Sequence, residues 1–215
     1  LGDDHPDVAV ALHNLGVMVE DPEEAIELLT QALDLRRGLY DPDDPRTAKT
    51  LSNLALAYAR LGDPRAVPLA EEALELRRRR LGGDHPQISH ALGSLAAALL
   101  GTGRVDEGIA HYRLSIEQAE RTLGPDHPTV AYPAARLGNA LLELDRAQDA
   151  EPLLRRAFDI RRAAMEGDAP LVEKARADLA KCLRRLGRHR DADELDAAEA
   201  QMVHGNRQGG NDRER

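Results

Sequence analysis

The chain reads as a series of paired amphipathic helices. Apolar residues recur three and four positions apart over long stretches, with charged residues between them, which is the period of a helix with one buried face. Clusters of Gly, Pro and Asp interrupt the pattern at regular intervals. We therefore expect ten helices, over residues 6–19, 22–39, 45–61, 64–81, 86–102, 105–123, 128–144, 147–165, 170–186 and 189–203.

A linker that ends in proline marks the period of these pairs. The linkers read LGDDHP, DPDDP, LGGDHP, LGPDHP and EGDAP, and they end at Pro6, Pro45, Pro86, Pro128 and Pro170. Successive prolines are 39, 41, 42 and 42 residues apart. Proline suits the first turn of a helix because the N–H that it lacks would have no partner there. The Asp-rich residues before the proline are expected to cap that helix end.

Large and small residues occupy fixed positions in each repeat. The ninth residue after the proline is Leu15, Leu54, Leu95, Leu137 and Leu179, and the next residue is always Gly or Ala. The second helices carry small residues at matching positions, which are Ala25, Ala66, Gly108 and Ala150. Small side chains let helices approach closely, and large ones fill the grooves between them. The pattern predicts an all-α fold in which helical hairpins share one apolar seam.

On these residues the sequence resembles the tetratricopeptide repeat family, and within it the branch with 42-residue repeats found in kinesin light chains and many bacterial signalling proteins. The resemblance covers residues 1–203 and implies a right-handed α-solenoid of about five antiparallel helix hairpins. The repeats are expected at 6–44, 45–85, 86–127, 128–169 and 170–203, and residues 204–215 as a disordered tail. In the fifth repeat Arg176 replaces a leucine, which favours a polar cap.

The resemblance also implies a protein-binding module whose first helices line a concave groove. The family's groove positions fall four, eight and eleven residues after each proline. The residues that we assign to a peptide-binding groove are Lys49, Asn53, His90, Ser94, Tyr132, Arg136, Asn139, Lys174 and Lys181. Asn amides both donate and accept hydrogen bonds, and the cations suit an acidic peptide. The alternative is that these polar side chains only keep the protein soluble.

Composition narrows the classes of partner. The net charge of -9 disfavours a nucleic-acid binder, because Lys and Arg supply most of that affinity. Cys182 is the single cysteine, so no intramolecular disulfide is possible, and it is expected to be a small buried residue in a reducing cytoplasm. No stretch reaches the roughly 18 apolar residues of a membrane span, and no signal peptide opens the chain. We expect no membrane association.

Three histidines are candidate metal ligands, but their spacing in the sequence argues against a shared metal site. His5, His85 and His127 each precede a repeat proline, so they lie in separate loops and are expected to be structural. The run Arg77–Arg80 is either an anion site or, as the helix dipole favours, a solvated helix end. The acidic pairs are expected on helix surfaces. We therefore assign no catalytic residue, metal ligand or cofactor, and the protein is not expected to be an enzyme.

Three functions follow from this sequence. The first is a module that binds a peptide or partner segment in the groove. The second is the sensor or regulatory repeat domain of a larger signalling NTPase, because the chain begins within a repeat. The third is a self-assembling scaffold, or an enzyme as the weakest option. The excess of Arg over Lys suggests a GC-rich bacterial genome, and the partner's identity and the oligomeric state stay open.

Overall fold

A computed structural model describes residues 5–164 and 169–197 of the chain. All regular structure in these residues is helical. The helices are α1 Pro6–Met18, α2 Pro22–Leu39, α3 Pro45–Arg60, α4 Ala66–Leu81, α5 Pro86–Gly101, α6 Val105–Leu123, α7 Pro128–Glu143, α8 Ala147–Ala163 and α9 Ala169–Arg185, followed by a helical segment over 189–197. The expected all-α fold is confirmed, and the helix bounds agree with the expected ones to within two residues wherever both ends are described.

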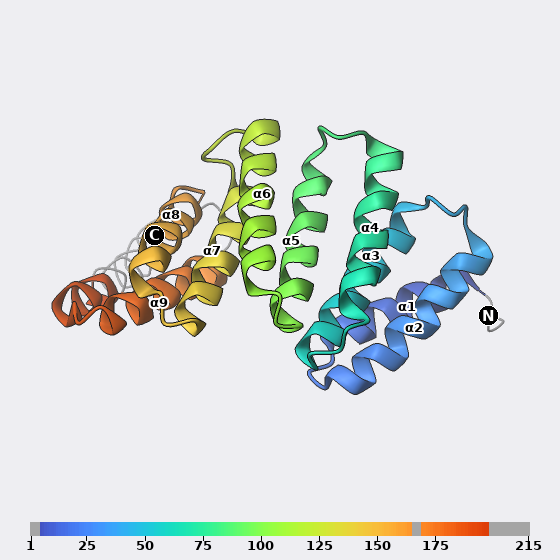
Figure 1. The fold of residues 1–215 in the computed structure, drawn as a ribbon, viewed down its shortest axis with the longest axis horizontal. Helices are drawn as coiled ribbons and strands as arrows, with labels where there is room; N and C mark the ends of the chain where they lie inside the picture. The colour runs from blue at the N-terminus through green and yellow to red at the C-terminus, as the bar shows by residue number, and fades with distance from the viewer. Residues whose placement is uncertain (1–4, 165–168, 198–215) are drawn as a thin grey trace, which may run out of the picture. The chain divides into compact units, whose positions relative to one another are not determined.

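The chain forms two compact units. Unit 1, Leu1–Pro125, contains α1 to α6, and unit 2, Asp126–Arg215, contains α7 to α9 and the segment 189–197. In each unit consecutive helices form hairpins (Figure 1). The expected boundaries of the repeat domain stay a prediction, and the expected tail over 204–215 lies outside the described residues.

Unit 1 is built from three hairpins, α1 with α2, α3 with α4, and α5 with α6. α2 packs against α3 and α4 against α5, and the first helices α3 and α5 also touch each other. A Cβ atom added to Gly101 would lie 2.4 Å from the Ala59 carbonyl oxygen. Glycine is therefore required where the ends of α3 and α5 meet, because no larger residue fits against that backbone atom.

Unit 2 repeats this packing with α7, α8 and α9. A Cβ atom on Gly138 of α7 would lie 2.6 Å from Cγ of Leu154 on α8, so the glycine makes room for the leucine. α9 packs against both α8 and α7. Cys182 is completely buried in this unit, and its thiol donates to the Ala147 carbonyl at 3.4 Å. The expectation of a small buried cysteine is confirmed.

The turn inside a hairpin has a fixed position. The residue 17 positions after the proline has a positive φ in four repeats. It is glycine at Gly62, Gly103 and Gly187, which tolerates this conformation without strain. In the fourth repeat Asp145 takes the same place with a φ of 60°, and aspartate is one of the few side chains that visit this region.

In four repeats the residue before the repeat proline caps the helix that follows. In three linkers that residue is histidine, and its Nδ1 atom accepts a hydrogen bond from the backbone N–H two residues later. The three residues are His5, His85 and His127. Their structural role is confirmed, whereas the expectation of aspartate caps holds for Asp44 but not for these three helices.

Leu15 departs from the predicted seam. Leu54 and Leu95, at the same repeat position, are 3% and 4% exposed, because another hairpin of unit 1 packs in front of each. No such hairpin precedes α1 within the described residues, and Leu15 is 54% exposed. The expectation of one shared apolar seam therefore fails at this leucine of the first repeat.

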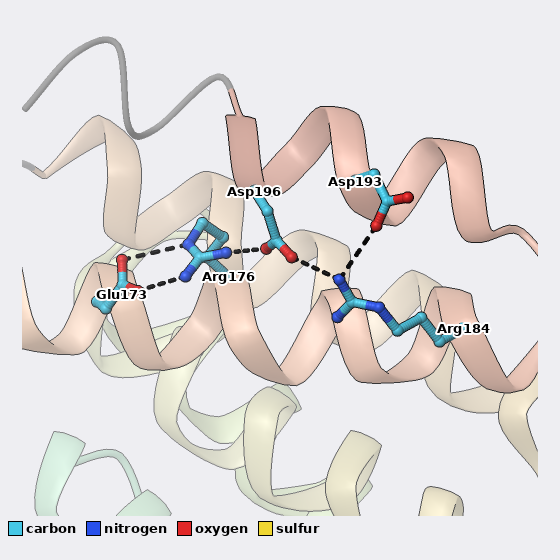
Figure 2. Close-up of polar contacts among 5 residues, drawn as sticks. All are labelled: Glu173, Arg176, Arg184, Asp193 and Asp196. Atoms are coloured by element: carbon cyan, nitrogen blue, oxygen red, sulfur yellow. Dashed lines mark hydrogen bonds and ion pairs between the residues drawn. The ribbon is translucent and has the colours of Figure 1, made fainter.

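Ion pairs hold the last helical segment against α9. Figure 2 shows Arg176 between Glu173 and Asp196, and Arg184 between Asp193 and Asp196. Asp196 lies 26 residues after its repeat proline, where Leu154 lies in the preceding repeat. The Arg176 side chain is only 15% exposed. Charged groups thus replace an apolar contact in this hairpin.

Candidate functional site

The residues assigned to the groove lie on one exposed strip of each first helix. We call the positions four, eight and eleven residues after the repeat proline the groove face. Every assigned residue is exposed or half-exposed, whereas the positions five, six, nine and ten residues after the proline in α3 and α5 are buried. In unit 1 the groove face carries Lys49, Asn53, His90 and Ser94. In unit 2 it carries Tyr132, Arg136, Asn139, Lys174 and Lys181.

Direct contacts join neighbouring helices along the groove face. In unit 2 the Asn139 amide on α7 donates to a carboxylate oxygen of Asp178 on α9 at 2.9 Å. In unit 1 the Asn53 amide on α3 lies 3.4 Å from Nε2 of His13 on α1. Asn residues on the groove face thus bridge successive repeats, and these contacts hold their amide groups in place.

Lysine is confined to this face. The sequence contains three lysines, Lys49, Lys174 and Lys181, and all three are at exposed groove-face positions. Arginine, in contrast, occurs on first helices, second helices and linkers alike. Lysine carries a compact, mobile and strongly hydrated charge, so these three side chains are suited to reach an anionic partner.

A buried polar cluster lies directly behind the groove face of unit 1. His13 is 2% exposed, and its Nδ1 atom is 3.5 Å from Nη1 of Arg36 and 3.3 Å from the Thr50 hydroxyl. Arg36 comes from the second helix α2 and is itself 4% exposed. Burial first, and then the charges of Arg36 and Lys49, lower the pKa of His13 to about 4. The ring is therefore neutral at pH 7, and its nitrogen atoms serve as hydrogen-bonding partners for the side chains around it.

Arg36 belongs to a set of arginines at one repeat position, of which the sequence reasoning considered only Arg77. The residue nine positions before a repeat proline is Arg36, Arg77, Ala119 and Arg161. Arg36 and Arg161 both donate to the carbonyl of the residue that follows the proline, at 2.7 Å and 3.4 Å. Each reaches from a second helix to the first helix of the next repeat. The repeat register was a signal that could have identified them.

Arg77 differs from the rest of the run Arg77–Arg80. Arg78 pairs with Glu75 at 3.0 Å and Arg79 with Asp43 at 2.7 Å, as expected for a solvated helix end. Arg77 is half-buried and turns toward α3, where it donates to the Ser52 hydroxyl at 3.2 Å. The prediction of a solvated end is therefore wrong for Arg77, because this register position points between the first helices.

The described residues offer neither a cluster of metal ligands nor a membrane-spanning helix. In the described part of the chain, no three His, Cys, Asp or Glu side chains are grouped so as to hold a metal ion. None of the helices described is both long enough and apolar enough to cross a bilayer. The acidic pairs Glu23–Glu24 and Glu71–Glu72 are exposed on second helices, as expected.

Comparison with known sequences decides the family. The tetratricopeptide repeat family matches residues 17–67, 90–163 and 129–197, which together make up most of the chain. The chain belongs to the tetratricopeptide repeat family. Its first and second helices are thus the two helices of each tetratricopeptide hairpin, and the protein is an interaction module of the kind this family provides. None of the curated proteins matches the sequence.

Solved structures show the same fold for this tetratricopeptide-repeat protein. A Podosopora anserina structure titled as a kinesin light chain with nearly identical TPR-like repeats matches with a TM-score of 0.65 and 23% identity, over 95% of this chain and 98% of that one. BtubC (BKLC) from P. vanneervenii matches with a TM-score of 0.65 and 19% identity, over 93% and 89%. Aspartyl phosphate phosphatase F from Bacillus subtilis matches with a TM-score of 0.68 and 15% identity, over 94% of this chain and 49% of that one. The expected likeness to kinesin light chains is confirmed at the level of the fold.

Proposed function

We propose that this protein binds a peptide segment of another protein along the groove face, and that it acts by binding rather than by catalysis. The observation that carries the proposal is the confinement of all three lysines to the groove-face positions. If the lysines were placed by chance, they would not be expected to collect at the groove-face positions of an arginine-rich surface. A requirement for mobile positive charges on that face would explain their placement.

The groove face offers two kinds of contact to a peptide. Asn53 and Asn139 supply amides that match the donors and acceptors of a peptide backbone. Lys49, Arg136 and Lys174 supply positive charge on a chain whose net charge is -9. Opposite charge on the partner speeds encounter and fixes the register of binding, so we propose an acidic peptide as the ligand.

The proposed setting is the cytoplasm of a bacterium. A single buried cysteine needs no oxidising compartment, and the preference for Arg over Lys fits a GC-rich genome. The ligand class does not depend on this setting, because it follows from the groove face alone.

A capture experiment tests the binding proposal. The intact protein is used to capture partners from its native lysate, and captured proteins that bind again as purified components are kept. The variant with Asn53→Ala, Arg136→Ala and Asn139→Ala is expected to bind these partners at least about tenfold more weakly, since each lost hydrogen bond contributes roughly 1 kcal/mol. Circular dichroism checks that the variant is folded.

A matched variant controls for the loss of polar side chains. Gln31, Arg113 and Gln148 are exposed on the second helices α2, α6 and α8, and their replacement by Ala removes the same types of group. This control is expected to bind as the wild type does. Acylation of Lys49, Lys174 and Lys181, measured by mass spectrometry, should slow when partner is bound. Equal binding by both variants, or acylation rates that partner leaves unchanged, would refute the groove assignment.

A further inference from the structure

The two asparagines that bridge successive repeats use the same atom for the bridge. In unit 2, Nδ2 of Asn139 on α7 donates to Oδ2 of Asp178 on α9 at 2.9 Å. An ionised carboxylate only accepts hydrogen bonds, so this contact fixes which way the Asn139 amide is turned. In unit 1, Nδ2 of Asn53 on α3 lies 3.4 Å from Nε2 of His13 on α1. The direction of this second contact depends on which nitrogen of the His13 ring carries the proton.

The Thr50 hydroxyl determines where the His13 ring carries its proton. Because the pKa of His13 is lowered to about 4, the ring is neutral and has a single N–H. The Thr50 hydroxyl donates its only hydrogen to the Arg46 carbonyl at 3.0 Å. Its oxygen therefore acts as an acceptor toward Nδ1 of His13, which lies 3.3 Å away. The N–H of the ring is thus at Nδ1, and the lone pair of Nε2 accepts from Nδ2 of Asn53.

The neighbouring guanidinium of Arg36 is compatible with a proton at Nδ1. Both hydrogens of its Nη1 atom have closer acceptors, which are the Arg46 carbonyl and the Thr50 hydroxyl oxygen. Nδ1 of His13 is farther from Nη1, at 3.5 Å, so no Nη1 hydrogen is left for it. The Thr50 oxygen has two lone pairs and can accept from Arg36 and from the His13 ring together.

Both asparagines therefore keep their amide oxygen for a ligand. With Nδ2 engaged, the Oδ1 atoms of Asn53 and Asn139 have no hydrogen-bond partner among the described residues, and both atoms are reached by solvent at the groove face. An amide oxygen only accepts hydrogen bonds. The exposed ammonium groups of Lys49 and Lys174 lie at other positions of the same face. The groove face thus offers fixed acceptors and mobile cations at separate places.

We propose that His13 and Asp178 are positioning residues that hold Asn53 and Asn139 as acceptors for backbone N–H groups of the bound peptide. This inference rests on the proposed peptide-binding function and narrows it, because acidic side chains of the peptide are left to the lysines. An acceptor that is fixed in advance loses little conformational entropy on binding. A helical peptide keeps most of its N–H groups in internal hydrogen bonds, so the peptide binds in an extended form.

The first test observes the proton on the His13 ring directly. Long-range ¹H–¹⁵N NMR spectra of the intact protein near neutral pH distinguish a histidine with its proton at Nδ1 from one with its proton at Nε2. The His13 signals are those that disappear in His13→Gln. We expect the proton at Nδ1. A proton at Nε2 would make the ring a donor toward Asn53, which contradicts the proposed role of His13.

A pair of acidic peptides tests the need for backbone N–H groups. The probes are acetyl-Glu-Ala-Glu-Ala-Glu-Ala-amide and its counterpart with L-lactic acid in place of each alanine, so that esters replace amides while the carboxylates stay. Both are titrated into the intact protein to about 10 mM and followed by NMR. The ester peptide is expected to bind about fivefold more weakly, as the loss of one hydrogen bond predicts. In Asn53→Ala with Asn139→Ala, the two peptides should bind equally.

Two substitutions at Asp178 separate positioning from charge. Asp178→Asn and Asp178→Leu both remove a negative charge from the groove face, but only the new asparagine keeps an oxygen that accepts from Asn139. If charge alone mattered, both variants would bind the amide peptide equally well. We expect Asp178→Asn to keep the preference for the amide peptide, and Asp178→Leu to bind it more weakly and with a smaller preference. Circular dichroism checks that both variants are folded.

Several results would overturn the positioning role. These are a proton at Nε2 of His13, no saturable binding of the amide peptide, equal binding of the amide and ester peptides by the wild type, or equal behaviour of the two Asp178 variants. A preference for the amide peptide that persists without Asn53 and Asn139 would overturn it as well. The capture of natural partners decides the proposed function separately, because it does not depend on how these two amides are turned.

Discussion

The Asn53 side-chain amide touches the buried ring of His13, with Nδ2 of Asn53 3.4 Å from Nε2 of His13. A residue of the groove face is thus fixed by a histidine of the preceding repeat that has almost no exposure to solvent. Because the same ring also meets Arg36 and Thr50, one neutral imidazole joins α1, α2 and α3. The protonation state of His13 therefore bears on both stability and groove geometry.

Acid is expected to destabilise unit 1 through His13. The pKa of His13 is about 4 in the folded state, below its usual 6.5, so between these values the unfolded chain takes up a proton that the folded chain refuses. The stabilisation is complete above pH 6.5 and is lost as the pH falls toward 4, by about 3 kcal/mol in total. Urea unfolding of wild type and His13→Gln from pH 7.5 to 4.5 measures this. The difference between the two proteins should shrink with acid, and a constant difference would contradict the prediction.

Gly101→Ala is expected to destabilise the protein. The new methyl group would lie 2.4 Å from the Ala59 carbonyl oxygen, so α3 and α5 must separate at a cost of roughly 1–3 kcal/mol. Gly38→Ala is the matched control. Nothing lies within 4 Å of its added methyl group, and the better helix former should stabilise α2 by about 0.5–1 kcal/mol. Chemical denaturation followed by circular dichroism compares them, and equal stability of the two variants would show that the close approach is not restrictive.

Asp196→Ala is expected to loosen the last helical segment. The change removes the partner that Arg176 and Arg184 share, and it leaves the half-buried Arg176 with only Glu173 among the contacts of Figure 2. Hydrogen exchange over residues 189–197 should accelerate about tenfold or more, with α7 unchanged.

A double variant tests whether the ion pair itself is required. Arg176→Leu with Asp196→Leu restores apolar residues of the kind seen at Leu51 and Leu154. Replacement of a buried ion pair by apolar groups is often neutral or stabilising, so protection from exchange should return to at least the wild-type level. Continued fast exchange in the double variant would mean that the charges specify this docking.

Much of the fold follows from periodicity, because helix starts and turns carry strong local signals. The repeat prolines placed the starts of α3, α5 and α7 correctly, and the recurring leucines predicted the burial of Leu54 and Leu95. Leu15 was misassigned because its burial depends on a neighbouring hairpin and not on its own helix. The local sequence pattern shows which face of a helix is apolar, but it does not show whether a neighbouring helix buries that face.

The candidate site was only partly accessible to sequence reasoning. The groove-face positions could be assigned by register, and the structure finds all of them at the surface. Arg36 was missed, and Arg77 was assigned to a solvated helix end, because both belong to second helices, which the pattern assigns to the opposite side of each hairpin. Only the three-dimensional packing shows that a long side chain passes between two first helices.

The exchange of Thr50 for Ala91 at equivalent repeat positions has a consequence for how the repeats can be transferred to other proteins. The buried Thr50 hydroxyl accepts a hydrogen bond from Arg36, whereas Arg77 donates to the Ser52 hydroxyl on α3. Two arginines at the same repeat position therefore contact different helices, Arg36 the first helix of the next repeat and Arg77 the first helix of its own. A designer who grafts one of these repeats for its surface residues alone would break such contacts, and must carry over the buried layer beneath as well.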